Sequence, residues 1–370
     1  MKTEIYKFGD VTVNFDRMRV PLSAQQRAER KGSYRYYGAQ GVIDFVDDFL
    51  FDGAYLLIAE DGENLKSNKQ NIAQLVHGQF WVNNHAHIIQ TNHLCDLRYL
   101  YYLINSLDLS GFITGSAQPK LSQANLNSIP LKIPDIKIQR KISAILGALD
   151  DKIALNVRIN DNLADLLHTH YQSCFEHTAT GNKSGMLSDI CEFSRERIAI
   201  SEISAEEYFS TENMLPNKAG VTGATMLPTV AQTTRCRKGD TLISNIRPYF
   251  KKIHYCQSDC ACSSDVLCFV PRQTIYSAFL FCTLYADRFF DYMVSGSKGT
   301  KMPRGDKQQI MAYSIPLPVN STLLSFNEVA VPILAAIGQN RSENNTLSSL
   351  RDTLLPRLMS GELDVSGLDL

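Results

Sequence analysis

The sequence predicts an α+β protein in which two similar globular modules are separated by two long antiparallel helices that form a coiled-coil-like spacer. The main observation is an internal repeat within 370 residues. A repeat at half the chain length indicates two similar modules rather than one large domain. Three motifs carry it: Asn156-x3-Asn160-x2-Leu163 recurs from Asn340, Ile129-Pro130-Leu131 recurs from Ile315, and Gly115-Ser116 with Lys120 recurs as Gly296-Ser297 with Lys301.

The spacing of apolar residues predicts the two helices. In both, apolar or Asn residues recur at alternating steps of four and three, which is the a and d pattern of a coiled coil. An Asn in such a seam fixes the register, because Asn opposite Leu would lack a hydrogen-bond partner. We therefore expect antiparallel packing with the Asn layers near the middle. The predicted interface residues are Ile142, Leu146, Leu149, Ile153, Asn156, Asn160, Leu163, Ile333, Ile337, Asn340, Asn344 and Leu347.

Capping residues predict where the helices begin. Asp135 is placed to cap the first helix, and Ser325 with Glu328 can form a capping box for the second. Pro332 should kink the second helix or delay its start, and Arg351, at an apolar position of the seam, should loosen that end. The predicted divisions are 1–134 for the first module, 135–180 for the first helix and a linker (polar over 178–185), 181–322 for the second module, and 323–370 for the second helix and C-terminal tail.

The modules themselves read as mixtures of strands and helices. Short apolar runs predict buried strands, and alternating runs predict half-buried ones. The expected elements are buried strands over 55–59 and 240–244, alternating strands over 81–89 and 260–269, and helices over 97–107 and 277–290.

Charge, apolar runs and cysteine content narrow the classes of protein to which the chain can belong. The net charge of −1 argues against non-specific coating of nucleic acid, yet basic residues cluster locally, with six against one acidic residue between Arg235 and Lys252. No run approaches the ~18 apolar residues of a membrane span, and the N-terminus lacks the apolar core of a signal peptide. With nine cysteines, an odd number, buried thiols are expected. We expect a cytoplasmic protein that does not contact membranes.

The loops that follow the module helices are the best candidates for a DNA interface. Both are rich in Gly, Ser, Lys, Arg and Gln, whose backbone and side-chain donors suit phosphates and base edges. An aromatic and basic run at 34–38 and the basic cluster before Lys252 add further candidates. The predicted DNA-binding residues are Arg35, Tyr36, Tyr37, Lys66, Ser116, Gln118, Lys120, Arg247, Lys251, Lys298, Lys301 and Arg304.

Three patterns invite a catalytic or metal site, and each has a plainer interpretation. The cysteines at 256, 260, 262 and 268 do not have paired zinc-ligand spacing, so buried thiols in a strand are favoured. His85 and His87 lack a third ligand and fit a sheet. The carboxylates Asp52, Glu60, Asp61 and Glu63 are not repeated in the second module. No methyltransferase, phosphate-loop or nucleophile-elbow motif occurs. We therefore expect neither a catalytic site nor a bound metal.

The helical motifs together resemble those of the specificity subunits of type I restriction–modification enzymes. The resemblance is carried by the Ile-Pro-Leu ends of the modules, Gln139-Arg140-Lys141-Ile142, Leu149-Asp150-Asp151-Lys152-Ile153, the paired Asn motifs, and the segment from Leu350 to Leu363. The second helix departs from the pattern, with Phe326-Asn327-Glu328-Val329 in place of a Gln-x-x-Ile opening.

The resemblance implies a function. Each module would be a target recognition domain for one half of a bipartite DNA sequence, and the helices would set the gap. Two methyltransferase subunits and restriction subunits would dock on the chain. S-adenosylmethionine, ATP and magnesium would then belong to those partners, so this chain would hold no cofactor and form the non-catalytic part of a site-specific deoxyribonuclease and adenine methyltransferase complex.

Two alternatives remain open at this point. The chain could be the DNA-reading fragment of a fused restriction–methylation enzyme, or a coiled-coil scaffold with no role in DNA binding. The missing methyltransferase motifs disfavour the first, and the recurring basic loops disfavour the second.

Overall fold

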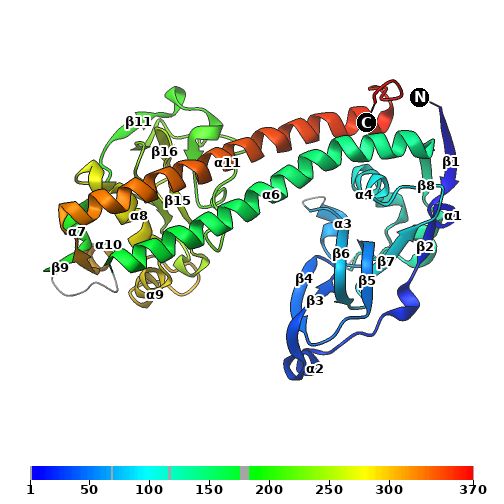
Figure 1. Ribbon diagram of the computed structural model, residues 1–370, viewed down its shortest axis with the longest axis horizontal. Helices are drawn as coiled ribbons and strands as arrows, with labels where there is room; N and C mark the ends of the chain where they lie inside the picture. The colour runs from blue at the N-terminus through cyan, green and yellow to red at the C-terminus, as the bar shows by residue number, and fades with distance from the viewer. Residues whose placement is uncertain (1, 68–69, 116–117, 176–182, 370) are drawn as a thin grey trace. The chain divides into compact units, whose positions relative to one another are not determined.

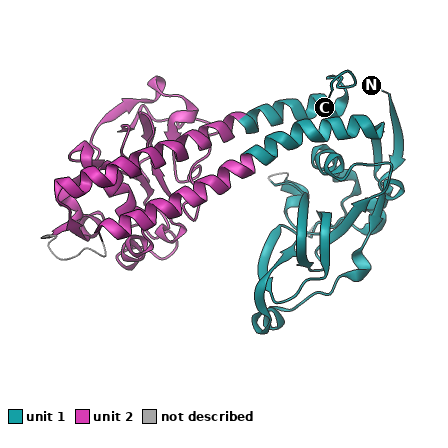
Figure 2. Ribbon diagram, viewed as in Figure 1, with its two compact units in different colours: residues 1–152, 347–370 teal, residues 153–346 magenta. Residues whose placement is uncertain are grey.

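The computed structural model describes residues 2–67, 70–115, 118–175 and 183–369 (Figure 1). The chain divides into two compact units (Figure 2). Unit 1 consists of 1–152 and 347–370, and unit 2 consists of 153–346. The long helices α6 (Ile136–Phe175) and α11 (Asn320–Ser360) contribute residues to both units.

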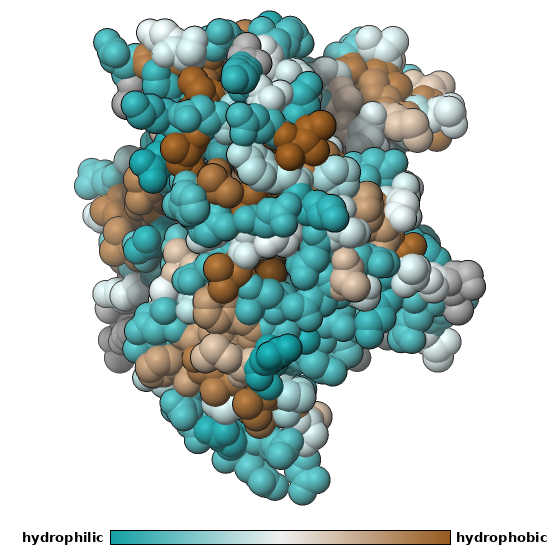
Figure 3. Space-filling model, turned by 90° about the vertical axis from the view of Figure 1, so that its right-hand side faces the viewer, coloured by the Kyte–Doolittle hydropathy of each residue, from teal (hydrophilic) through white to brown (hydrophobic). Residues whose placement is uncertain are grey.

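Unit 1 is built on a six-stranded sheet of order β2-β7-β5-β6-β3-β4, antiparallel except for the parallel pair β3 and β6. The separate strands β1 and β8 pair with each other. Figure 3 shows a face on which hydrophilic residues predominate and hydrophobic residues form small groups. The elements are β1 (Thr3–Lys7), α1 (Phe8–Val11), β2 (Thr12–Asn14), α2 (Ala24–Glu29), β3 (Lys31–Gly38), β4 (Gly41–Val46), β5 (Phe51–Ala59), α3 (Asn64–Ser67), β6 (Ala73–Val82), β7 (Ala86–Thr91), α4 (Leu97–Ser106), α5 (Gln123–Ser128) and β8 (Pro130–Pro134).

Unit 2 has two four-stranded sheets, β10-β17-β14-β15 and β11-β13-β16-β12, and a separate pair of β9 with β18. Its largest core packs α8 and α9 against the first sheet and both long helices. The elements are β9 (Lys183–Met186), α7 (Leu187–Ile190), β10 (Cys191–Phe193), β11 (Arg197–Ala199), β12 (Tyr208–Phe209), β13 (Gln232–Cys236), β14 (Thr241–Ser244), β15 (Ile253–Tyr255), β16 (Cys260–Cys262), β17 (Val266–Pro271), α8 (Ser277–Tyr285), α9 (Asp287–Ser295), α10 (Lys307–Met311) and β18 (Ser314–Leu317).

The two units share one topology. In each, a central strand lies between two antiparallel neighbours, with β7-β5-β6 in unit 1 matched by β17-β14-β15 in unit 2. The parallel pair also recurs, because β3 runs beside the end of β6 and β12 runs beside β16. Strand β6 of unit 1 therefore corresponds to β15 and β16 together, and the interruption between these two splits the sheet of unit 2.

The ends of the modules match in a register that differs from the predicted one. Strand pairing places Tyr6 opposite Leu131 in unit 1 and Gly185 opposite Ile315 in unit 2. The backbone N–H of Phe8 donates to the carbonyl of Ile129, and that of Leu187 donates to Tyr313, each at 2.8 Å. Leu131 thus corresponds to Ile315, at the same shift along the chain that relates the two Asn motifs. The two Ile-Pro-Leu sequences are therefore out of register with each other in the structure.

Two predictions of strand and helix extent are wrong. The alternating segments over 81–89 and 260–269 each contain a turn, which separates β6 from β7 and β16 from β17. The polar residues 83–85 and 263–265 form these turns. Because they fit the alternation of apolar and polar residues, the sequence pattern did not reveal the break. The predicted helix over 277–290 ends at Tyr285, and α9 begins at Asp287 because Ala286 adopts an extended conformation. The predicted linker lies over 178–182 outside the described residues, and residues 183–185 belong to β9.

The first long helix begins as predicted and the second does not. The Asp135 carboxylate accepts the backbone N–H of Lys137 at 2.9 Å, directly before α6. Helix α11 begins at Asn320, so Ser325 lies inside it, and it continues through Pro332. By length and mean hydropathy α11 could also cross a membrane. A third of its most apolar window is buried within the chain.

Within unit 2 the two helices are joined by the predicted layers of Asn. The Nδ2 of Asn340 donates to Oδ1 of Asn160 at 2.8 Å, and the Nδ2 of Asn156 donates to Oδ1 of Asn344 at 2.8 Å. The residue numbers rise on one helix as they fall on the other, so the helices are antiparallel. Asn156 and Asn160 are buried. The prediction of an antiparallel seam with paired Asn residues is confirmed in this unit.

Within unit 1 the helix pair is closed by an ion pair. The Arg351 guanidinium lies 2.9 Å from a carboxylate oxygen of Asp150, and the other Asp150 oxygen accepts the hydroxyl of Tyr102 at 2.6 Å. Ile142 and Leu146 are buried beside Leu354, Leu355 and Leu358. The expectation that Arg351 loosens this end is wrong, because a carboxylate on the facing helix neutralises it.

The Asn160 and Asn340 layer makes a prediction for stability. Asn160→Leu should lower the free energy of unfolding by about 1–3 kcal/mol, because Asn340 would lose its acceptor at a partly buried position. Adding Asn340→Leu should restore much of the loss, since two apolar residues would then face each other. Urea denaturation of both single variants and the double variant measures the coupling. Strictly additive losses would show that the two amides do not act as a pair.

Candidate nucleic-acid interface

A short loop closed by a β-bridge occurs at the same place in both units. In unit 1, Thr114 and Lys120 exchange two backbone hydrogen bonds of 2.8 Å. In unit 2, Lys298 and Arg304 exchange two backbone hydrogen bonds of 2.9 Å. We call the two loops that these pairs close the cation loops. They are the predicted Gly-Ser loops, and their ends are fixed by hydrogen bonds.

The residue that ends each cation loop also bridges to the turn after the central strand. Lys120 bridges to Asp61, which follows β5, and Arg304 bridges to Ile246, which follows β14. Lys120 and Arg304 are therefore equivalent, at the same shift that relates Asn156 to Asn340. The predicted match of Lys120 with Lys301 is wrong, because the second cation loop differs in sequence and its closing residue comes later.

Each of the two equivalent cations is exposed and held by one carboxylate. Lys120 is 56% exposed, with Nζ 3.3 Å from Glu60, and Arg304 is 57% exposed, 2.9 Å from Asp265. Burial alone would raise the pKa of Glu60, but hydrogen bonds from Arg19 and Lys120 and nearby positive charge lower it. Exposed pairs contribute at most about 1 kcal/mol. The cations are thus positioned by the carboxylates and remain able to exchange them for phosphate oxygens or base edges.

Glycines set the shape of the cation loops. Gly115 has φ +83°, and a Cβ on it would lie 2.2 Å from the carbonyl oxygen of Gln118. Gly299 has φ +101°. Both conformations favour glycine. The side chain of Gln118 is exposed, as its predicted role requires. Ser116, a further predicted contact, lies outside the described residues.

The second cation loop carries two further predicted lysines. Lys298 is 81% exposed, and its Nζ lies 2.5 Å from Asp306. The Asp306 carboxylate also accepts the backbone N–H of Gln308 at 2.9 Å, at the start of α10. Lys301 is exposed and, within the described part of the chain, makes no hydrogen bond or ion pair. Lys301 is therefore less restrained than Lys298.

The structure contradicts the prediction for Tyr36 and Tyr37. Tyr36 is fully buried, and its hydroxyl accepts the backbone N–H of Leu22 at 2.9 Å. Tyr37 is 6% exposed and packs edge-on against Phe80. Consecutive residues of β3 point to opposite faces, and both faces of the sheet are covered here. Neither ring is accessible to DNA, whereas Arg35 on the same strand is exposed.

The turns after the central strands carry the remaining predicted residues. Gly62 of unit 1 and Arg247 of unit 2 follow the bridging residues and have φ values of +114° and +50°. Lys66 is exposed on α3, just after Gly62. Arg247 is half-buried, its backbone N–H donates to Pro303 at 2.8 Å, and its Nε has no partner among the described residues.

Lys251 ends the turn of unit 2. Its Nζ lies 2.9 Å from Asp287, which also pairs with Lys218 at 2.7 Å. Hydrogen bonds from these two lysines lower the pKa of Asp287 to about 2. One carboxylate shared by two lysines leaves a net positive charge beside the turn.

Sequence reasoning missed the polar turn that supports each cation. The carbonyl of His85 accepts the backbone N–H of Glu60 at 2.9 Å, and the carbonyl of Asp265 accepts that of Asn245 at 2.8 Å. Asp265 then pairs with Arg304, while His85 Nδ1 lies 2.6 Å from Asp61. The signal that could have revealed these turns is the run of three polar residues inside each alternating segment.

The residues of the candidate metal and catalytic patterns either have hydrogen-bond partners, are buried thiols, or lie apart from one another. His87 is buried, with Nδ1 2.6 Å from Asp16 and Nε2 2.8 Å from the carbonyl of Leu121. The cysteines at 256, 260, 262 and 268 are buried thiols, as predicted. Beside them, burial raises the pKa of Asp240 to about 6. Among the described residues no group of three His, Cys, Asp or Glu side chains could hold a metal ion.

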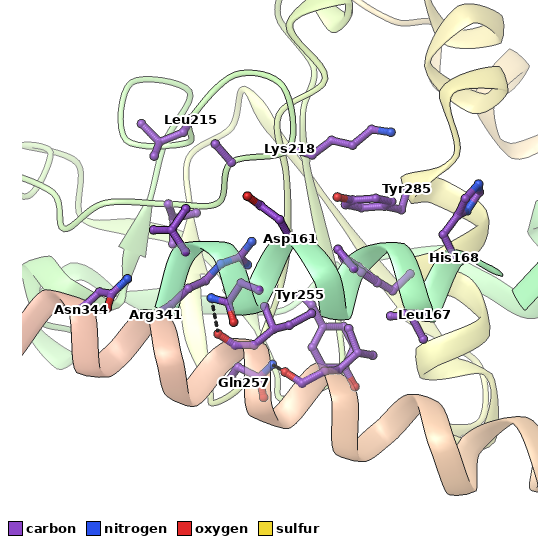
Figure 4. A pocket seen from close by; sticks show the side chains of 18 of the residues that line it. Asp161, Leu167, His168, Leu215, Lys218, Tyr255, Gln257, Tyr285, Arg341 and Asn344 are labelled. Atoms are coloured by element: carbon purple, nitrogen blue, oxygen red, sulfur yellow. Dashed lines mark hydrogen bonds between the residues drawn. The ribbon is translucent and has the colours of Figure 1, made fainter. Parts of the chain in front are cut away.

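Unit 2 also contains a cavity of about 360 Å³ between the two long helices, α8 and the loop over 215–222 (Figure 4). Asp161 and Arg341 enter it from the two helices, and Lys218 and Tyr285 lie at its other wall. Burial lowers the pKa of Arg341, while Tyr285 and Asp161 oppose the shift. The cavity lies beside the paired helices. Lys218, which lines it, also pairs with Asp287, the carboxylate that holds Lys251.

Comparisons with known proteins agree with this architecture. Residues 2–164 match the family model of the type I restriction modification DNA specificity domain. A putative type I restriction enzyme specificity subunit of Haemophilus influenzae is 34% identical over 131 residues, or 35% of this chain and 33% of that protein. The EcoprrI specificity subunit of Escherichia coli is 31% identical over 132 residues, or 35% and 32%. The matched part thus spans about a third of these relatives.

One solved structure extends the likeness over the whole fold. The crystal structure of a type I restriction–modification S subunit from M. genitalium has a TM-score of 0.61 at 15% identity, and the match covers 97% of this chain and 96% of that one. The fold defines a class of proteins with two similar α+β modules and two long helices. Residues 2–164 thus resemble the DNA specificity domain of type I restriction–modification systems, and the fold of the whole chain is similar to that of a type I S subunit.

Proposed function

We propose that this chain reads a bipartite DNA target for a type I restriction–modification complex, with unit 1 on one half-site and unit 2 on the other. It has no catalytic role of its own in this proposal. The family description, a DNA specificity domain, supports DNA as the ligand.

The observation that carries the proposal is the repeated cation loop. Lys120 and Arg304 occupy one structural position in two modules whose sequences differ, and each is exposed beside a supporting carboxylate. A bidentate guanidinium suits guanine, whereas an ammonium group suits phosphate or a single acceptor. Two related modules with different cations at one position are suited to two different half-sites.

The helix pair would fix the gap between the half-sites. Its Asn layers select one register of α6 against α11. A sliding pair would vary the gap, whereas a single register keeps it constant. The outer surfaces of the helices would dock two methyltransferase subunits, and restriction subunits would join them. S-adenosylmethionine, ATP and magnesium would bind those partners, and the complex would act in the cytoplasm.

The test is selection of the full chain against a random-sequence duplex library. We expect enrichment of duplexes with two short conserved blocks at one fixed spacing. Methylation sequencing of the host genome, with and without the gene, should report the same two blocks. Enrichment of a single block, or of none, would contradict a bipartite reader.

A further inference from the structure

Backbone strain in unit 2 is concentrated in one place. Four residues other than glycine have positive φ within the described chain: Asn217, Lys218, Arg247 and Lys251. All four lie in two turns that are adjacent in space. Such conformations cost free energy, and they cluster where function requires a fixed local shape. We call the segment from Arg247 to Lys251 the strained turn.

The second turn braces the strained turn through its backbone. The N–H of Asn217 donates to the carbonyl of Phe250 at 2.8 Å, and that of Lys218 donates to Lys251 at 3.0 Å. Inside the strained turn, the N–H of Phe250 donates to Arg247 at 3.0 Å. The turn is therefore held from outside and from within.

The strained turn presents two aromatic rings to solvent. Tyr249 is 48% exposed and Phe250 is 38% exposed. Their ring centroids lie 4.8 Å apart, so the two rings form one apolar surface. Neighbouring exposed aromatic residues on a restrained turn are unusual, because folding normally buries such rings.

Positive charge surrounds the two rings. Arg247 and Lys251 flank them, and the Lys252 ammonium group lies 5.9 Å from the centre of the Phe250 ring. The backbone N–H of Arg247 also donates to Pro303 at 2.8 Å, within the second cation loop. The strained turn is thus joined to the second cation loop at Arg247. An apolar surface framed by cations fits a nucleic acid better than an apolar protein surface.

The equivalent turn of unit 1, over residues 62–67, has no exposed pair of aromatic rings. Gly62 takes the place of Arg247 and adopts positive φ without the cost that a side chain adds. The residues that follow are Glu63, then Asn64 and Leu65, both buried, then Lys66. No aromatic ring occurs at this turn of unit 1 among residues 62–67.

We propose that Tyr249 and Phe250 form an apolar wedge that stacks on, or inserts into, a base step of the half-site read by unit 2. The proposal rests on the proposed function and adds an asymmetry to it. Unit 2 reads its half-site partly through the deformability of a base step, and unit 1 does not deform its half-site in this way.

The test uses the full chain and duplexes enriched from the random-sequence library. 2-Aminopurine is placed in turn at each adenine-compatible position, and its fluorescence rises where a base unstacks. We expect one unstacked step, in the half-site of unit 2. The double variant Tyr249→Ala with Phe250→Ala should lose this signal and bind about tenfold more weakly. Tyr249→Phe, the matched control, keeps the ring and should retain both.

Different results of this test would contradict the wedge and the proposed DNA-reading function. Sequence-selective binding without an unstacked step, and with unchanged affinity of the double variant, would overturn the wedge alone. No sequence-selective binding by the unmodified chain would overturn the proposed function. Loss of affinity for a partner subunit, with DNA binding intact, would make the rings a protein contact and contradict the proposal. Because the fluorescence scan uses the unmodified chain, it does not depend on how the variants fold.

Discussion

Deleting residues 152–158 from α6 together with residues 342–348 from α11 should shorten the preferred gap between the half-sites by roughly three base pairs. Seven helical residues rise about 10 Å, and a base pair occupies about 3.4 Å. The deletion removes the whole layer of Asn156 and Asn344, which hydrogen-bond to each other. It leaves the Asn160 and Asn340 layer and the Asp150 ion pair in place. Selection from a random-sequence duplex library measures the new gap.

The matched design is essential to this experiment. Deleting 152–158 alone would place Asn residues of one helix opposite apolar residues of the other, and the chain should become unstable. This single deletion is the control for the helix pair. If the double deletion folds and still selects the original gap, the helices do not measure the distance between the half-sites.

Arg304→Ala should weaken the reading of one half-site, and Lys120→Ala should weaken the other. Removal of a base-contacting Arg costs about 1–3 kcal/mol and relaxes the preference at that position. We expect a loss of affinity of roughly 5- to 150-fold for Arg304→Ala. A lysine on phosphate would weaken binding to all sequences alike and reduce the salt dependence. Equilibrium binding to duplexes altered in one half-site at a time distinguishes these effects.

Arg237→Ala is the matched control for Arg304→Ala. Arg237 belongs to the same unit, is 52% exposed and pairs with Glu196 at 2.7 Å. It precedes β14, whereas Arg304 bridges to Ile246, beyond the other end of that strand. We expect unchanged affinity for this variant. Equal losses for both variants would indicate general electrostatic attraction rather than a positioned contact.

The helix pair was predictable because its signal is local. Spacings of four and three residues place Asn156 and Asn160 on one face of α6, and their partners on one face of α11. This holds however the two modules fold. The start of α11 was not predictable in this way. The residues from Asn320 to Leu324 carry no Pro or Gly that would stop a helix, and the hydroxyl of Ser325 offered a cap that the longer helix does not use.

The register of the modules and the buried tyrosines required the folded structure. The Ile-Pro-Leu repeat suggested that Ile129 matches Ile315, yet strand pairing matches Leu131 with Ile315, since pairing depends on partners far away in the chain. Tyr36 and Tyr37 followed an exposed Arg35 and looked accessible. Only the clusters on the two faces of the sheet reveal that both rings are core residues.

The sequence predicted the loops of the candidate interface but not the residues that support them. Glycines and lysines revealed the loops, because their composition departs from that of the helices before them. The carboxylate that holds Arg304 belongs to Asp265, which lies 39 residues earlier in the sequence, and only the polar run from Ser263 to Asp265 marks its turn. Tyr249 and Phe250 are exposed in a turn whose positive φ values at Arg247 and Lys251 are unfavourable for these residue types, so composition alone does not predict this turn.

The pairing of β1 with β8, and of β9 with β18, has a consequence for how such proteins diversify. Each pair joins the first strand of a module to the last, so the chain enters and leaves the module at one point. In the proposed function, exchange of the residues between two such paired strands would change the target sequence and leave the helix pair unchanged.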